Sequence, residues 1–161
     1  MNNTVIRRFV FLVWVGFLLS AGPLHAQREK LPPEDVEFVE QKWPDAKRTY
    51  TGLRFVVLKA GQPDGPTPKA GSLVKVLYKG MLLNGTVFDQ SPDAAHPLEA
   101  RIGRSELIEG WDEAVQKMRR GDKWLLIVPP EMAYGIRGKP PTIPRSATLI
   151  FEMELVDFSQ E

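Results

Sequence analysis

The stretch LIEGWDEAV, residues 107–115, places a tryptophan, Trp111, between a glycine and two acids. This tryptophan is either a core residue at the start of a helix or the wall of a binding site. Residues 111, 114, 115 and 118 are apolar and recur at i, i+3, i+4 and i+7, so they share one helix face. We predict a helix over residues 111–121, with acids at the positive end of its dipole, basic residues at the negative end, and Gly121 as a left-handed cap.

The rest of the chain holds few groups for covalent or metal chemistry. Cysteine is absent, the chain has two histidines, and the G-x-S-x-G, H-E-x-x-H and P-loop patterns do not occur. His96 lies in the turn-rich stretch SPDAAHP, which indicates an exposed loop residue. A formal net charge of +1 argues against a nucleic-acid partner, because such proteins carry a clustered excess of Lys and Arg. An enzyme built from this chain would work without a nucleophile, a metal or another cofactor.

Alternating apolar residues predict strands around the helix. The alternating segments are residues 52–61, 73–78 and 147–158, and residues 123–128 form a short, nearly continuous apolar run that also predicts a strand. Asn84-Gly85, between two apolar arms, predicts a hairpin. A sheet several times longer than its only helix can bury the apolar stripe of that helix by curling around it. We therefore expect an α+β fold in which a curved antiparallel β-sheet wraps around one short α-helix.

A long connection over residues 129–146 lacks regular periodicity and contains five prolines and two glycines. Loops of this length inside a compact domain are usually functional or disordered. Tyr134, Ile136 and Ile143 are apolar groups that a solvated segment would not need, which argues against disorder. We interpret the connection as a rigid lip that overhangs a hydrophobic site.

The N-terminus has the three zones of a secretory signal. Arg7 and Arg8 precede an apolar run of 11 residues, and Ala26 supplies a small residue for cleavage. The run is shorter than the roughly 20 residues that cross a bilayer, so we expect cleavage and no stable membrane anchor. Loss of residues 1–26 lowers the formal net charge from +1 to about −1. We expect a periplasmic or secreted protein.

The composition divides the remaining chain. Residues 27–49 are charged and interrupted by prolines, which is typical of an extension or linker, with one short helix from about Glu34 to Lys42. Residues 50–158 carry the alternating pattern and are predicted to form the domain. Residues 159–161 are left as a C-terminal tail.

Several separated motifs resemble the FKBP-type peptidyl-prolyl cis-trans isomerases. They are VLYKGMLLNGTVFDQS, PLEARIGRSELIEGWDEAVQKMRRGDKWLLIVPPEMAYGIRG and IPRSATLIFEMEL, and they keep the order and spacing of that family. The resemblance covers about residues 50–158. It implies a half-open antiparallel sheet around one helix, with a hydrophobic pocket between sheet and helix that binds Xaa-Pro segments.

The resemblance also implies a role for each matching residue. Trp111 would form the pocket floor, and its aromatic walls would be Tyr78, Phe88 and Phe151. Asp89 and Tyr134 would be the polar members. The apolar edge would comprise Leu107, Ile108, whose backbone N–H would meet a bound carbonyl, and Ile143, which would close over the ligand.

Two positions depart from the family pattern. Leu98, with Ala100 two residues later, stands where many members have an aromatic residue, which keeps the site apolar and is expected to widen it. Thr142 stands where an aliphatic residue is common, and it should make the lip slightly more polar.

The implied activity is isomerisation of Xaa-Pro bonds in exported polypeptides, with macrolides of the rapamycin or tacrolimus type as further ligands. One alternative is a proline-peptide-binding module or holdase chaperone with little turnover. The sequence opposes it weakly, because we see neither a domain inserted in the Tyr134 loop nor a long dimerising helix. A small-molecule carrier is a third interpretation, and it rests only on the apolar cleft.

Overall fold

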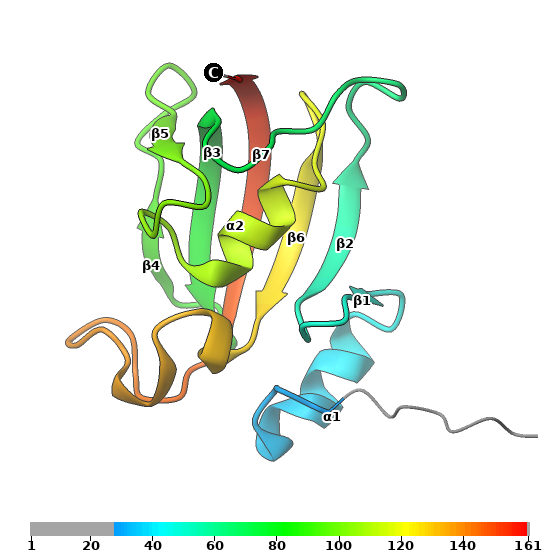
Figure 1. Ribbon diagram of the computed structural model, residues 1–161. Coiled ribbons are helices and arrows are strands. Elements are labelled where there is room, and N and C mark those ends of the chain that lie inside the picture. The colour runs from blue at the N-terminus through cyan, green and yellow to red at the C-terminus, as the bar shows by residue number, and fades with distance from the viewer. Residues whose placement is uncertain (1–27, 161) are drawn as a thin grey trace, which may run out of the picture.

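The computed structural model describes residues 28–160, and the predicted signal peptide, residues 1–26, lies outside these described residues. One antiparallel sheet curves around a central helix (Figure 1). The sheet has seven strands in the order β1-β2-β6-β7-β3-β4, and β5 also pairs with β3. In chain order the elements are α1 (Pro33–Lys42), β1 (Lys47–Arg48), β2 (Arg54–Lys59), β3 (Leu73–Leu82), β4 (Val87–Gln90), β5 (Leu98–Arg101), α2 (Glu109–Val115), β6 (Lys123–Val128), the 3-10 helices η1 (Pro130–Met132) and η2 (Gly135–Arg137), and β7 (Leu149–Ser159). Among residues 28–160, no helix is both long enough and apolar enough to cross a bilayer.

The inner face of the sheet and the apolar stripe of α2 form the main core. Trp111, Ala114, Val115 and Met118 are all buried there, as the helical spacing predicts. Alternate residues of β7 face them, and these are Leu149, Phe151, Met153 and Leu155. The expected curved antiparallel sheet around a short helix is therefore confirmed.

The bounds of the predicted helix were wrong. Helix α2 begins at Glu109, because the Ile108 carbonyl already accepts hydrogen bonds from the N–H groups of Trp111 and Asp112. It ends at Val115, and a turn carries Met118 into the core.

The basic residues expected at the helix C-terminus have other partners. The Arg120 Nε donates to Asp157 Oδ1 at 2.5 Å, and its guanidinium stacks on the Phe158 ring. The Arg119 Nε donates to the Gly65 carbonyl at 3.0 Å. Gly121 does have a left-handed φ of 82°, but it lies in the turn before β6 and does not cap α2.

Strand β3 has two different partners along one of its sides. One side pairs along its whole length with β7. The other side pairs with β5 over residues 73–76 and with β4 over residues 79–81. Between the two, at Tyr78, Ser91 replaces a strand partner: its N–H donates to the Tyr78 carbonyl at 2.9 Å, and its Oγ accepts from the Tyr78 N–H at 3.1 Å.

The N-terminal segment covers the outer face of the sheet. Val39 of α1 and Leu31 are buried against Leu125, Ile127 and Ile150, which point away from α2. Strand β6 therefore has both faces covered, which explains why its sequence KWLLIV is apolar at five successive positions.

Polar contacts also tie the N-terminal segment to the domain. The Glu29 carboxylate lies 2.8 Å from the guanidinium of Arg54, a residue that is only 7% exposed, and 3.1 Å from the guanidinium of Arg48. The hydroxyl of buried Thr148 donates to Asp35 Oδ2 at 2.6 Å. Residues 28–49, which the sequence suggested as an extension or linker, thus pack on the sheet.

Val39→Ala tests this packing. The change removes two methyl groups from a fully buried position, so we expect the free energy of unfolding to fall by about 1–3 kcal/mol. Urea denaturation should show a lower midpoint with an unchanged m-value. Glu37→Ala, at an exposed position of the same helix, is the matched control and should change stability by less than about 0.5 kcal/mol. Equal midpoints for Val39→Ala and the parent chain would contradict the packing role.

Candidate active site

A cavity of about 670 Å³ opens between α2, the β3–β4 hairpin, β7 and the loop after η1. Nine of the residues that line it are the predicted Tyr78, Phe88, Asp89, Leu98, Leu107, Ile108, Trp111, Tyr134 and Phe151. The structure therefore brings together residues that are up to 73 positions apart in the sequence, from 78 to 151.

An aromatic cluster forms the apolar part of the cavity. Trp111 is 4% exposed, and the Tyr78 and Phe151 rings meet it edge to face, with centroids at 4.9 and 5.1 Å. Phe88 packs on Phe151 in the same geometry, with centroids 5.7 Å apart. Edge-to-face contacts of this kind add about 0.5–1.5 kcal/mol each beyond area burial, so the cluster holds its rings in fixed orientations.

Two glycines allow this cluster to close. A Cβ on Gly80 of β3 would lie 2.7 Å from Phe88 and 2.9 Å from Phe151, so the two rings fill the space of the missing side chain. A Cβ on Gly110 would lie 2.6 Å from Val128, so this glycine lets the start of α2 approach β6. Gly110 thereby places its neighbour, Trp111, against the sheet.

A β-bulge places two consecutive residues on the same cavity. The pairing of β3 with β4 shifts between Gly80 and Met81, because Asp89 opposes the first and Val87 the second. Phe88 is the extra residue of the bulge. Side chains of a regular strand alternate between faces, whereas a bulge can turn neighbours the same way. Phe88 and Asp89 accordingly both line the cavity.

The polar side of the cavity centres on Asp89. The Tyr78 hydroxyl donates to Asp89 Oδ2 at 2.8 Å, and the Gln90 N–H donates to Oδ1 at 2.9 Å. Burial of the Tyr78 hydroxyl, its hydrogen bond to Asp89 and the Asp89 charge all raise the pKa of Tyr78 well above its ordinary value. Tyr78 therefore stays protonated at physiological pH and holds the carboxylate in one orientation.

Tyr134 and Lys139 enter from the loop between β6 and β7. The Lys139 Nζ lies 5.5 Å from the centroid of the Tyr134 ring, within the range of a cation–π contact. Both residues line the cavity.

Ile108 forms the edge immediately before α2. It has extended backbone angles, with φ −66° and ψ 150°. Its carbonyl caps the helix, and within the described part of the chain no group accepts a hydrogen bond from its N–H. Among those residues there is also no group of three or more His, Asp or Glu side chains that could hold a metal ion.

Three residues singled out from the sequence lie elsewhere. Ile143 is 3% exposed in the main core and does not line the cavity, because its N–H and carbonyl both pair with Lys139 and draw it beneath the loop. Ala100 is buried in β5, and Thr142 is exposed with its hydroxyl donating to the Lys139 carbonyl at 3.3 Å. Neither Ala100 nor Thr142 lines the cavity, so the expected effects of these two residues on its width and polarity find no support.

Sequence reasoning missed the charged rim of the cavity. Its members are Glu106, Glu109, Asp112 and Lys139. The available signal was the pair of acids, Glu109 and Asp112, on either side of Gly110 and Trp111. From the sequence, Asp112 was explained by the helix dipole and was given no place in a site.

Comparisons with known proteins agree with this geometry. The family FKBP-type peptidyl-prolyl cis-trans isomerase matches residues 65–156. FK506-binding protein 1 of Dictyostelium discoideum is 42% identical over 107 residues, which is 66% of this chain and 98% of that protein. The FKBP-type 22 kDa peptidyl-prolyl cis-trans isomerase of Escherichia coli K12 is 38% identical over 140 residues, 85% of this chain and 66% of that one. The crystal structure of FkpA from Escherichia coli superposes with a TM-score of 0.69 at 38% identity, covering 78% of this chain and 58% of that chain.

Fold, cavity and sequence together define a peptidyl-prolyl cis-trans isomerase. Within that class, the chain belongs to the FKBP-type family.

Alkaline titration tests the Tyr78–Asp89 contact. The folded-state pKa of Tyr78 is raised, so the unfolded chain loses this proton first, and the stability that Tyr78 contributes falls as pH rises above about 10. Absorbance at 295 nm should show that one of the chain's three tyrosines ionises only as the protein unfolds. Tyr78→Phe should remove this late component, whereas its persistence in Tyr78→Phe would contradict the assignment.

Proposed function

We propose that the cavity on α2 is where this isomerase accelerates rotation about Xaa-Pro bonds of exported polypeptides. The observation that carries the proposal is the Trp111 floor, which Tyr78 and Phe151 hold edge to face beneath a cavity with a polar rim. A proline ring is flat and apolar enough to lie on such a floor.

The chemistry requires no covalent intermediate. Resonance in the amide sets a rotational barrier of about 18–20 kcal/mol. A planar amide is polar, and its twisted transition state has lost that resonance. An apolar site that excludes water favours the twisted amide over the planar ground state. Such differential binding is what accelerates the rotation.

Each part of the cavity has a role in this proposal. The aromatic cluster, Leu98 and Leu107 supply the apolar environment. The Ile108 N–H donates to a substrate carbonyl, which orients the peptide next to Trp111. The Tyr134 hydroxyl donates to a carbonyl oxygen of the peptide, and Asp89, fixed by Tyr78, accepts a hydrogen bond from a backbone N–H of the peptide beside the Xaa-Pro bond.

Asp89→Ala and Trp111→Ala test these roles. Hydrogen bonds to charged groups contribute about 1.5–3 kcal/mol, so Asp89→Ala should lower kcat/KM by about tenfold to hundredfold. Trp111→Ala removes the floor and should lower it at least as much. The measurement is the cis-to-trans rate of an Xaa-Pro peptide. Glu37→Gln, at an exposed position of α1, is the control.

Circular dichroism of each variant separates loss of activity from loss of folding. A folded parent protein that leaves the peptide at its uncatalysed rate would contradict the proposal. Binding of a macrolide such as rapamycin or tacrolimus to the same cavity should inhibit the parent protein competitively.

The export part of the proposal rests on the sequence of residues 1–26. Intact mass of the protein recovered from a periplasmic or secreted fraction should correspond to a chain that begins at Gln27. Replacement of Ala26 by a bulky residue such as Phe should block this cleavage, because signal cleavage requires a small residue there. Recovery of exported parent protein that retains Met1 would contradict the signal-peptide assignment.

A further inference from the structure

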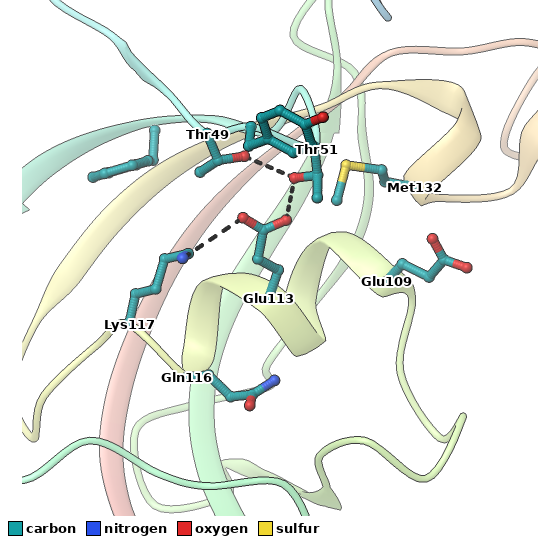
Figure 2. A pocket seen from close by; sticks show the side chains of 9 residues that line it. Thr49, Thr51, Glu109, Glu113, Gln116, Lys117 and Met132 are labelled. Carbon is teal, nitrogen blue, oxygen red and sulfur yellow. Dashed lines mark hydrogen bonds and ion pairs between the residues drawn. The ribbon is translucent and has the colours of Figure 1, made fainter. Parts of the chain in front are cut away.

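A second cleft, of about 700 Å³, lies on the flank of α2 (Figure 2). The helix forms one wall, and residues 49–51, before β2, form the other. Phe55 and Met132 supply apolar lining. Glu109 lines both this flank cleft and the isomerase cavity, so the two adjoin at the start of α2.

The flank cleft carries more carboxylate than ammonium charge. Figure 2 shows Glu113 reaching from α2 toward Thr51, whose hydroxyl donates to it, and Lys117 approaching the same carboxylate at 3.9 Å. Glu109 is exposed, and within residues 28–160 it forms no ion pair. Glu113 lies beyond the first helical turn, where the helix dipole has little influence, so the dipole does not account for its position.

The acidic character continues into the isomerase cavity. Asp89, Glu106 and Asp112 line that cavity, and Lys139 is its only ammonium group among the described residues. A polypeptide that crosses from one cavity to the other therefore meets predominantly negative groups.

Tyr50 supplies an aromatic surface at the flank cleft. Its side chain is 86% exposed, which is unusual for so large an aromatic residue in a structure with a well-formed core. Lysine and arginine lay their alkyl stems along apolar groups, place their cationic heads over aromatic faces, and pair with carboxylates. Tyr50, Met132 and the two glutamates provide all three kinds of contact.

We propose that the flank cleft binds a lysine or arginine side chain of the polypeptide whose Xaa-Pro bond occupies the isomerase cavity. This inference rests on the proposed function of that cavity. Glu113 is one helical turn beyond Glu109, about 6 Å, a span that about two residues of extended chain cover. That span adds about two residues to the separation between the proline and the part of the chain at Glu109, and we place the basic residue about four positions from the proline.

The test compares peptides with one Xaa-Pro core. The Lys peptide carries a lysine four positions before the proline and another four positions after it, and the Gln peptide carries glutamine at the same two positions. A short peptide contains only the core. We expect kcat/KM to be about threefold to tenfold higher for the Lys peptide than for the Gln peptide, mainly through KM, as one exposed ion pair and one cation–π contact would give. About 1 M salt should reduce the ratio, because it screens exposed charges.

Variants of the flank cleft provide the specific control. Glu113→Gln and Tyr50→Ala should each bring the Lys-to-Gln ratio of kcat/KM toward one. Glu37→Gln, the same chemical change at an exposed position of α1, should keep the parent ratio. The ratio is measured within each variant, so a variant with partly impaired folding lowers both values together.

Two outcomes overturn the inference while the proposed function stands. In both outcomes the short peptide is isomerised. In the first, the parent protein shows a Lys-to-Gln ratio of kcat/KM equal to one. In the second, the preference for the Lys peptide survives in both Glu113→Gln and Tyr50→Ala. Absence of any acceleration, including that of the short peptide, would instead overturn the proposed function and this inference with it.

Discussion

A helix of seven residues can bury only a narrow apolar stripe, so the sheet must curve to meet it. Trp111 is the largest side chain of that stripe, and it touches both β3, through Tyr78, and β7, through Phe151. The same indole that packs the helix against the sheet also lines the cavity. Its contacts therefore determine the packing of the core and the position of the site together.

A pocket open at the centre of a small domain removes apolar contacts from the core. The fold compensates on the other face of the sheet, where α1 and Leu31 cover β6 and β7. This covering segment precedes residue 65, at which the match to the family begins. Lys30 also reaches the loop that carries Tyr134, because its Nζ lies 2.9 Å from Glu131 Oε2. The N-terminal segment thus supports both the back of the sheet and one side of the site.

Local patterns predicted what depends on local spacing. The alternation in β7 and the buried stripe of α2 follow from residue periodicity, and the bounds of β6 follow from its short, nearly continuous apolar run. The identities of the nine cavity residues came from the family resemblance, since no single-sequence rule relates positions as distant as Tyr78 and Phe151.

Tertiary contacts decided the rest. The register of α2 depends on the close approach of Gly110 to Val128, and the neighbouring positions of Phe88 and Asp89 depend on a bulge against β3. Ile143 was expected over the ligand, but its pairing with Lys139 draws it under the loop. The strand β5 was not predicted, because four residues, LEAR, are too few to show a period. Its pairing with β3 lends it order that its own sequence does not specify.

Because one side of β3 pairs first with β5 and then with β4, the two walls of the site are attached to different halves of β3. Strand β5, which carries Leu98, pairs with the first half of β3. Strand β4, which carries Phe88 and Asp89, pairs with the second half. Ser91 closes the gap between them with two hydrogen bonds of its own. An insertion in the intervening turn can therefore be absorbed without a shift in the register of either wall. For protein engineering, this makes the two sides of the cavity separate units, and the side that carries Leu98 can be redesigned while Asp89 stays in place.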